Sequence, residues 1–294
     1  MAIFTGSGVA LVTPMKENYE INYDKLEELI EYHIKNGTDS IIICGTTGEA
    51  ATMTEAEHSN TVKACIDIVN KRIPVIAGTG SNCTRTAVEL SKKAEQDGAD
   101  GVLIVTPYYN KATQAGLKAH YKEIASNIKI PVVMYNVPSR TGCKLEAKTI
   151  ADLYKEVDNI TAVKEATGDI SFVADVMNYT DGKIDLYSGN DDQIVPVLSL
   201  GGKGVISVLA NIAPKESHDM VAAYLSGNVQ ESCALQLKYL QVIHALFSEV
   251  NPIPVKKAMN LMGMNVGSLR LPLTEMSAEK AAVLEAEMKK VGII

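Results

Sequence analysis

Eight short runs of apolar and β-branched residues recur along the chain, and helix-length segments separate them. The runs occupy residues 8–13, 40–44, 74–79, 101–106, 131–136, 160–165, 184–189 and 204–209. They are almost continuously apolar instead of alternating, which is typical of strands covered on both faces. The segments between them, such as 23–37 and 146–157, have one apolar side, and the segment 54–70 opens with Thr54 and Glu57 at capping-box spacing.

Eight strand–helix units in succession predict an α/β fold, the (β/α)8 TIM barrel, with parallel strands inside and helices outside. A doubly wound open sheet is the alternative, and it would need a reversal of strand order that a sequence does not reveal. After about residue 226 only helical patterns remain, and prolines and glycines interrupt them. We therefore predict a barrel over residues 1–226 and a small C-terminal helical domain over residues 227–294.

Charge and composition argue against several classes of function. The net charge is −7 and no dense Lys/Arg run occurs, so the chain lacks the basic surface that nucleic-acid binding needs. The opening MAIFTGSGVALVTP has no basic residue ahead of its apolar part, so we expect no secretion signal, and no run is apolar enough to span a membrane. The five cysteines form no Cys-x-x-Cys pair, which fits reduced thiols and predicts a cytoplasmic protein.

No motif for a metal or an organic cofactor is present in the sequence. The five histidines show no metal-ligand spacing, and we expect most of them on helix surfaces. GTGSN at 78–82 lacks the third glycine of a dinucleotide-binding loop. GGKG at 201–204 precedes the last strand, so we expect a turn at the end of the barrel opposite to any active site.

Polar residues gather where the predicted strands end, which is where barrel enzymes carry their reactive groups. Those outside the sixth strand are Thr46, Thr47, Tyr108, Tyr109, Tyr135, Arg140 and Gly189. Each also has an ordinary explanation. The threonines could cap the following helix, the tyrosines after the fourth strand could lie in the core or an interface, and the arginine could be a surface charge. Functionally, an arginine there can clamp a carboxylate with two hydrogen bonds, and a chain of hydroxyls can pass a proton.

Lys164 follows Ala162 and Val163 inside the sixth apolar run. Side chains alternate along a strand, so Lys164 shares a face with Ala162, and Tyr135 occupies a comparable late position on the neighbouring strand. If both side chains point inward, burial favours the neutral amine, which can attack a ketone and form a Schiff base. The alternative is that Lys164 reaches out of the strand end or pairs with a carboxylate.

Several motifs together resemble one known family. They are GTTGEAATM, TPYYNK, YNVPSRTG, AVKEATGD, YSGNDD, NPIPVKKAM and LRLPL. In this order and over essentially the whole chain, they are similar to the dihydrodipicolinate synthase family. That family belongs, with N-acetylneuraminate lyase, to the pyruvate-dependent class I aldolases.

The resemblance implies that Lys164 forms a Schiff base with pyruvate and that Tyr135 donates and accepts protons beside it. It further implies that Thr47 links Tyr135 to Tyr109, which a neighbouring subunit inserts across a tight dimer interface. The family is usually a homotetramer built as a dimer of such dimers. No metal or organic cofactor is implied.

The resemblance also implies the binding residues. Thr46, Thr47 and the backbone near Gly189 and Ile206 would hold pyruvate. Arg140 would bind the carboxylate of the second substrate, L-aspartate 4-semialdehyde, giving 4-hydroxy-tetrahydrodipicolinate for diaminopimelate and lysine biosynthesis. Sialic-acid lyases usually lack an arginine in this loop. The alternatives are a Schiff-base lyase for a 2-keto-3-deoxy acid or N-acetylneuraminate, and a non-catalytic pyruvate-sensing or scaffold protein.

Feedback-inhibited members of the family bind lysine at the dimer interface. The chain resembles them at His58, Asn82 and Tyr108, a possible allosteric site. It departs from them at Ala50, Glu55 and Thr86, where inhibited enzymes commonly carry Ser, His and Glu. Without that glutamate, the ammonium group of lysine loses its anionic partner, so we predict weak or absent inhibition by lysine.

Overall fold

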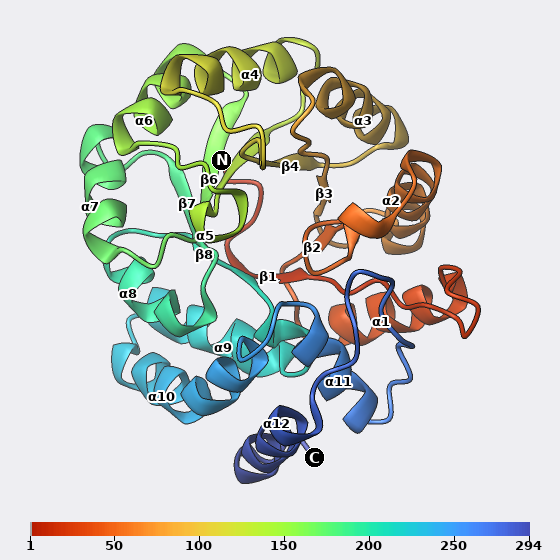
Figure 1. Cartoon of the computed structure of the whole chain (residues 1–294). Coiled ribbons are helices and arrows are strands. Elements are labelled where there is room, and N and C mark those ends of the chain that lie inside the picture. The colour runs from red at the N-terminus through yellow and green to blue at the C-terminus, as the bar shows by residue number, and fades with distance from the viewer. Residues whose placement is uncertain (1) are drawn as a thin grey trace.

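The computed structural model describes residues 2–294, and these residues form a closed barrel of eight parallel strands (Figure 1). The strands are β1 Gly6–Ala10, β2 Ser40–Ile43, β3 Val75–Gly78, β4 Gly101–Val105, β5 Val132–Asn136, β6 Ile160–Glu165, β7 Asp185–Ser188 and β8 Gly204–Ser207. They pair in chain order, and β1 also pairs with β8, which closes the ring. The predicted barrel is therefore confirmed, and an open doubly wound sheet is excluded.

Helices surround the ring of strands on the outside (Figure 1). They are α1 Tyr23–Lys35, α2 Glu55–Val69, α3 Thr84–Asp97, α4 Gln114–Ser126, α6 Ala147–Glu156, α7 Ile170–Tyr179, α8 Ile194–Ser199 and α9 Pro214–Leu225. Four short helices lie in the loops that follow strands, namely α5 Pro138–Thr141, η1 Ala50–Thr52, η2 Asp191–Gln193 and η3 Leu209–Asn211. At α2, Thr54 and Glu57 form the predicted capping box.

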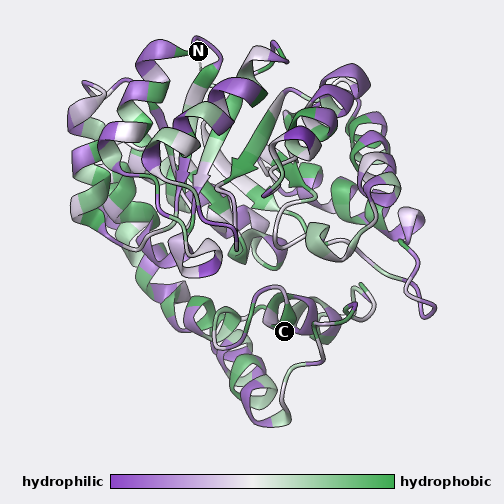
Figure 2. Cartoon of the chain, turned by 45° about the horizontal axis from the view of Figure 1, so that its top comes forward, coloured by the Kyte–Doolittle hydropathy of each residue, from purple (hydrophilic) through white to green (hydrophobic). Residues whose placement is uncertain are grey.

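Two apolar layers hold the barrel together, because successive side chains of a strand point to opposite faces. One layer fills the barrel interior and includes Ile42, Ala162 and Ile206. The other lies between strands and helices and includes Ile41 and Val163. Figure 2 shows the result, with hydrophobic strands inside and hydrophilic stretches on the outer helices. This double burial explains the continuously apolar strand sequences.

The N-terminal end of the barrel is closed by packing. The ring of Phe4 stacks on that of Tyr187 with their centroids 4.3 Å apart, and the Tyr187 hydroxyl donates to the Phe4 carbonyl at 2.7 Å. Gly204 has a φ of +154°, and a Cβ there would lie 1.8 Å from the Gly6 carbonyl oxygen. The GGKG segment thus lies, as predicted, at the end of the barrel opposite to the one where the polar residues gather. Its last glycine allows β8 to approach β1 closely.

Only helices follow residue 226 in the described part of the chain. They are α10 Val229–Leu246, α11 Ile253–Leu261 and α12 Ala278–Val291. In Figure 1 they lie below α8 and α9, and α10 packs along both α9 and α12. Whether residues 227–294 form a domain of their own stays a prediction. Among residues 2–294, none of the helices combines the length and the apolar character that a membrane crossing requires.

The expectation that most histidines lie on helix surfaces is wrong. His33, His58 and His120 are all at least nine-tenths buried. Their rings find partners inside the protein, for example the Thr38 hydroxyl 3.0 Å from Nδ1 of His33 and the Gly78 carbonyl 2.7 Å from Nε2 of His58. Imidazole is partly apolar, so one internal hydrogen bond is enough to accommodate a neutral ring in a helix–sheet contact.

Candidate active site

The C-terminal ends of β5 and β6 bring Tyr135 and Lys164 together. The two residues are paired in the strand register, and Nζ of Lys164 lies 4.4 Å from the centroid of the Tyr135 ring. Their exposed fractions are 7% and 6%. Strand alternation predicted that Lys164 shares a face with Ala162, and the structure shows that this face is the barrel interior. Among residues 2–294, no carboxylate lies within ion-pair distance of its amine.

The surroundings of Lys164 change its protonation. Burial lowers the pKa of Lys164 to about 8, the cationic Arg140 lowers this pKa further, and the carboxylate of Asp191 raises it. At pH 7 about one copy in ten would then carry a neutral amine, compared with roughly one in a few thousand for an ordinary lysine. A neutral amine in a water-poor pocket is a nucleophile toward a carbonyl carbon.

Asp191 is a functional candidate that the sequence did not single out. Its side chain is buried, and Oδ2 accepts hydrogen bonds from the backbone N–H groups of Val208 and Leu209, each at 2.9 Å. Oδ1 has no hydrogen-bond partner among the described residues. Burial raises the pKa of this carboxyl, while hydrogen bonds and Lys164 lower it. The YSGNDD motif contained the residue, but only the fold places its charge within range of Lys164.

The hydroxyl partner of Tyr135 differs from the one expected. Burial raises the pKa of Tyr135, whereas Arg140 and a hydrogen bond with Thr46 lower it. The buried Thr47 hydroxyl instead accepts from Nδ2 of Asn251 at 2.9 Å. Among residues 2–294 no hydrogen bond joins Thr47 to Tyr135, and the hydroxyl that acts on the phenol is that of Thr46, whereas the link from Thr47 to Tyr109 stays a prediction.

Asn251 is a second residue that sequence reasoning missed. It belongs to the segment before α11, and it contacts Thr47 through its side chain and Arg140 through its carbonyl. The guanidinium of Arg140 donates to that carbonyl at 3.3 Å. Arg140 itself lies in α5, exposed at the mouth of the barrel, where its charge acts on both Tyr135 and Lys164. Its remaining donors stay available for an anion.

Gly189 and Ile206 are the two remaining residues assigned to pyruvate binding. At Gly189, a Cβ would meet Cβ of Ala166 at 2.6 Å and Cε of Lys164 at 3.2 Å, so a side chain would crowd the lysine. Ile206 is fully buried in the barrel interior on β8. The structure thus places Gly189 beside Lys164 and Ile206 in the barrel interior, and their roles in pyruvate binding stay predictions.

Tyr109 is not part of this group within a single chain. It lies in the loop after β4 with 90% of its surface exposed and a φ of +71°, in the left-handed region that ordinary residues rarely adopt. Tyr108 beside it is 39% exposed. An exposed aromatic on a strained loop is typical of a contact with another molecule.

Of the residues of the possible allosteric site, Asn82 and Tyr108 lie in the loops after β3 and β4, and His58 lies in α2. Nδ2 of Asn82 donates to the Tyr108 carbonyl at 3.2 Å, and the His58 ring lies on the Gly78 carbonyl at the end of β3. The positions that depart from the inhibited pattern are Ala50 at the start of η1, Glu55 at the start of α2, and Thr86 in α3. Their effect on lysine binding stays a prediction.

Comparison with known proteins agrees with this geometry. The profile of the Dihydrodipicolinate synthetase family matches residues 3–291. The 4-hydroxy-tetrahydrodipicolinate synthase of Lachnoclostridium phytofermentans is 62% identical over 294 residues, which is 100% of both chains.

Two solved structures superimpose closely. The chloride-inhibited dihydrodipicolinate synthase of Acinetobacter baumannii complexed with pyruvate is 45% identical with a TM-score of 0.96, covering 99% of each chain. The enzyme of Cyanidioschyzon merolae with lysine bound is 39% identical with a TM-score of 0.97, covering 100% of each chain. Fold, motifs and identity over the full length agree, and the chain belongs to the dihydrodipicolinate synthetase family.

Proposed function

We propose that this protein condenses pyruvate with L-aspartate 4-semialdehyde to 4-hydroxy-tetrahydrodipicolinate, a step of diaminopimelate and lysine biosynthesis. The observation that carries the proposal is the environment of Lys164. Its amine is buried, no carboxylate of residues 2–294 lies within ion-pair distance of it, and its pKa is lowered to about 8. A scaffold protein would have no use for such a group, because burying an amine opposes folding.

In the proposed reaction, the neutral amine of Lys164 attacks the keto carbon of pyruvate. Loss of water leaves a protonated Schiff base, which draws electrons and lets the methyl carbon lose a proton. The resulting enamine carbon attacks the aldehyde carbon of the second substrate and forms the new carbon–carbon bond. The amino group of that substrate then displaces the lysine as the ring closes, so Lys164 is regenerated.

We assign the proton transfers to Tyr135. Its pKa is raised by burial, so the phenol stays protonated near neutral pH and can donate. Thr46 supplies the hydroxyl that bonds to it. Because a phenol that donates a proton must regain one, Thr46 would connect Tyr135 toward the solvent side of the pocket, where Thr46 is exposed.

Arg140 is the proposed clamp for the carboxylate of aspartate semialdehyde. It is exposed at the mouth of the barrel, and one hydrogen bond to the Asn251 carbonyl orients it. A guanidinium offers paired donors that match a carboxylate. A sugar aldehyde carries no such anion, and this is why we favour the condensation over cleavage of a sialic acid.

We propose a homo-oligomer, a dimer of dimers, in which Tyr109 completes the site of a neighbouring subunit. What supports this is the 90% exposure and the left-handed backbone of Tyr109 in its own chain.

We further propose that the reaction needs no metal or organic cofactor, because the Schiff base itself supplies the electron sink. The cytoplasm is the proposed location, supported by five cysteines that are all free, three of them buried.

Lysine is proposed to inhibit this enzyme weakly or not at all. Thr86 stands where inhibited relatives carry an acidic side chain, so a bound lysine would lack a partner for its ammonium group. The rate should stay nearly constant as lysine is raised to millimolar concentration. Loss of half the rate at that concentration would contradict the proposal.

The decisive experiment is reduction with borohydride in the presence of pyruvate, followed by mass mapping of peptides. We expect a stable adduct on the peptide that contains Lys164, and none on the Lys164→Ala variant. Absence of the adduct in the unaltered protein would refute the Schiff-base mechanism. Comparing rates with aspartate semialdehyde and with N-acetylmannosamine as partners of pyruvate then separates the condensation from the lyase reaction.

A further inference from the structure

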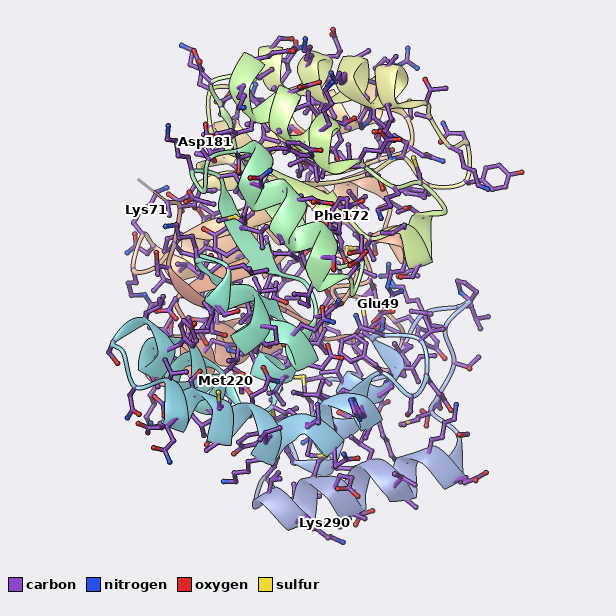
Figure 3. All side chains as sticks on the ribbon, turned by 90° about the vertical axis from the view of Figure 1, so that its left-hand side faces the viewer. Glu49, Lys71, Phe172, Asp181, Met220 and Lys290 are labelled. Atoms are coloured by element: carbon purple, nitrogen blue, oxygen red, sulfur yellow. The ribbon has the colours of Figure 1, made fainter. Side chains whose placement is uncertain are left out.

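The catalytic roles above leave three motifs partly unused. They are the end of GTTGE at Glu49, the NPIPVKKAM segment at 251–259 and the LRLPL segment at 269–273. The structure joins all three at one place, between the loop after β2 and the C-terminal helices. Glu49, labelled in Figure 3, lies between the barrel and those helices.

A buried ion pair forms the centre of this contact. Nζ of Lys256 lies 2.6 Å from Oε1 of Glu49, and the two side chains are 2% and 0% exposed. Nζ also donates to the Ser268 carbonyl at 2.8 Å, and Oε2 of Glu49 accepts from the backbone N–H of Arg270 at 3.1 Å. The carboxylate and the amine thus tie together three segments that are far apart in the sequence.

Stability alone does not account for this pair. Two charges taken out of water lose their hydration, and apolar side chains of the same volume often replace such a pair without loss of stability. A buried pair does, however, require one arrangement of the groups that carry it, since leaving either charge unpaired is costly. The pair therefore fixes the positions of the segments that carry Glu49 and Lys256.

The loop that Glu49 anchors is the one that carries the two threonines. Glu49 has a left-handed backbone with φ of +57°, and its N–H donates to the Thr46 carbonyl at 3.1 Å. Gly48 is packed so closely that a Cβ added to it would lie 3.1 Å from the Leu11 carbonyl oxygen. A rigid turn therefore connects the ion pair to Thr46, whose hydroxyl lowers the pKa of Tyr135. At the other end of the contact, Asn251 before α11 donates to Thr47.

We propose that the Glu49–Lys256 pair is a positioning device, which fixes α11 against the β2 loop and so sets the Thr46 hydroxyl for proton transfer with Tyr135. This rests on the proposed function and deepens it, because it separates two steps. Capture of pyruvate depends on Lys164 and does not need the pair. Removal of the methyl proton and protonation after bond formation depend on the pair through Tyr135.

The test uses the full-length enzyme with Glu49→Gln, Lys256→Met and the double variant. Gln keeps an acceptor for the Arg270 N–H, and the double variant leaves no unpaired charge, so it should fold even if a single variant does not. Four quantities are measured: the melting temperature, borohydride trapping of pyruvate on Lys164, kcat, and exchange of the pyruvate methyl protons for deuterium.

We expect the double variant to keep its Tm within about 4 °C and its extent of trapping within about twofold. Its kcat and its proton exchange should fall by about a hundredfold, which is the effect of misplacing a reacting group by about 1 Å. The KM for pyruvate should change little. Glu57→Gln is the matched control, because Glu57 pairs with Arg270 across the same contact nearer the surface and should leave kcat within about twofold.

Two results would overturn the inference. One is a double variant with unchanged Tm and unchanged kcat. The other is a fall of kcat, trapping and Tm in parallel in every variant, which would make the pair purely structural. Neither can be confused with failure of the proposed function, since that would appear as absence of pyruvate trapping in the unaltered enzyme.

Discussion

Two buried lysines of this protein have opposite surroundings. Lys164 and Lys256 are 6% and 1% exposed, and burial lowers the pKa of both. Lys256 touches the carboxylate of Glu49, which raises its pKa again. No carboxylate of residues 2–294 forms an ion pair with Lys164, whose pKa the more distant Asp191 raises and the cation Arg140 lowers. Burial alone does not make an amine a nucleophile. Whether a carboxylate touches it decides between a reactive group and a structural one.

Replacing the unpaired amine should have the largest effect on activity. Lys164→Met removes the nucleophile, and we expect kcat to fall at least about 10⁴-fold, because the reaction has no other group to hold pyruvate covalently. Its Tm should be equal to or above that of the unaltered enzyme, since a buried amine no longer has to be desolvated. Steady-state rates and thermal melting check both points. A substantial residual rate would contradict the assignment.

The same substitution at the paired lysine should also lower stability, in addition to the loss of proton transfer proposed above. Lys256→Met leaves the carboxylate of Glu49 buried without its cation, so we expect a loss of about 3–5 kcal/mol in the free energy of unfolding. Urea unfolding at one fixed protein concentration measures it. If Lys164→Met and Lys256→Met lowered stability equally, the distinction between the two lysines would fail.

The cation beside the reactive lysine should affect only the second substrate. Arg140→Ala is expected to lower kcat/KM for aspartate semialdehyde by about a hundredfold or more, because a charge-assisted carboxylate contact is lost. Trapping of pyruvate by borohydride should be retained. Arg140→Lys should recover part of the rate, since an ammonium group keeps the charge but not the paired donors. An equal loss of trapping and turnover would instead place Arg140 in pyruvate capture.

The buried imidazole of His33 should make stability depend on pH below neutrality. Burial lowers the pKa of His33 to about 3, so the folded protein leaves it neutral where the unfolded chain, with a pKa near 6.5, binds a proton. Between these values the unfolded state binds more protons, so stability falls as the pH drops through this window. At pH 5 the loss is about 2 kcal/mol relative to neutral pH. His33→Asn should flatten the pH dependence measured by unfolding at pH 7 and 5, and an unchanged slope would refute the assignment.

The smallest expected effect concerns the carboxylate near Lys164. Asp191→Asn keeps an oxygen for the N–H groups of Val208 and Leu209 but removes the charge that raises the pKa of Lys164. The pKa of Lys164 should fall further below its ordinary value. The pH profile of pyruvate trapping should therefore move to lower pH, with more neutral amine at pH 7. A move to higher pH would show that Asp191 does not act through its charge.

Much of the fold could be read from local patterns. The continuously apolar runs, the helix between each pair of runs and the capping box at Thr54 depend on residues within a few positions of each other, and all three were confirmed. Strand alternation placed Lys164 on the face of Ala162, but only the structure showed that this face is the barrel interior. The histidines were misjudged, because a polar ring accommodated by one distant hydrogen bond has no local signature.

The sequence by itself determined the barrel, the strand ends that carry the polar residues, and the lysine placed among apolar neighbours, since periodicity of 2 or 3.6 residues is a local property. Only the tertiary structure decided which groups touch. Asn251 reaches Thr47 across 204 positions, Glu49 meets Lys256, and Thr46 acts on the pKa of Tyr135. Such contacts depend on ring closure and on the packing of the C-terminal helices, which no spacing within one segment encodes.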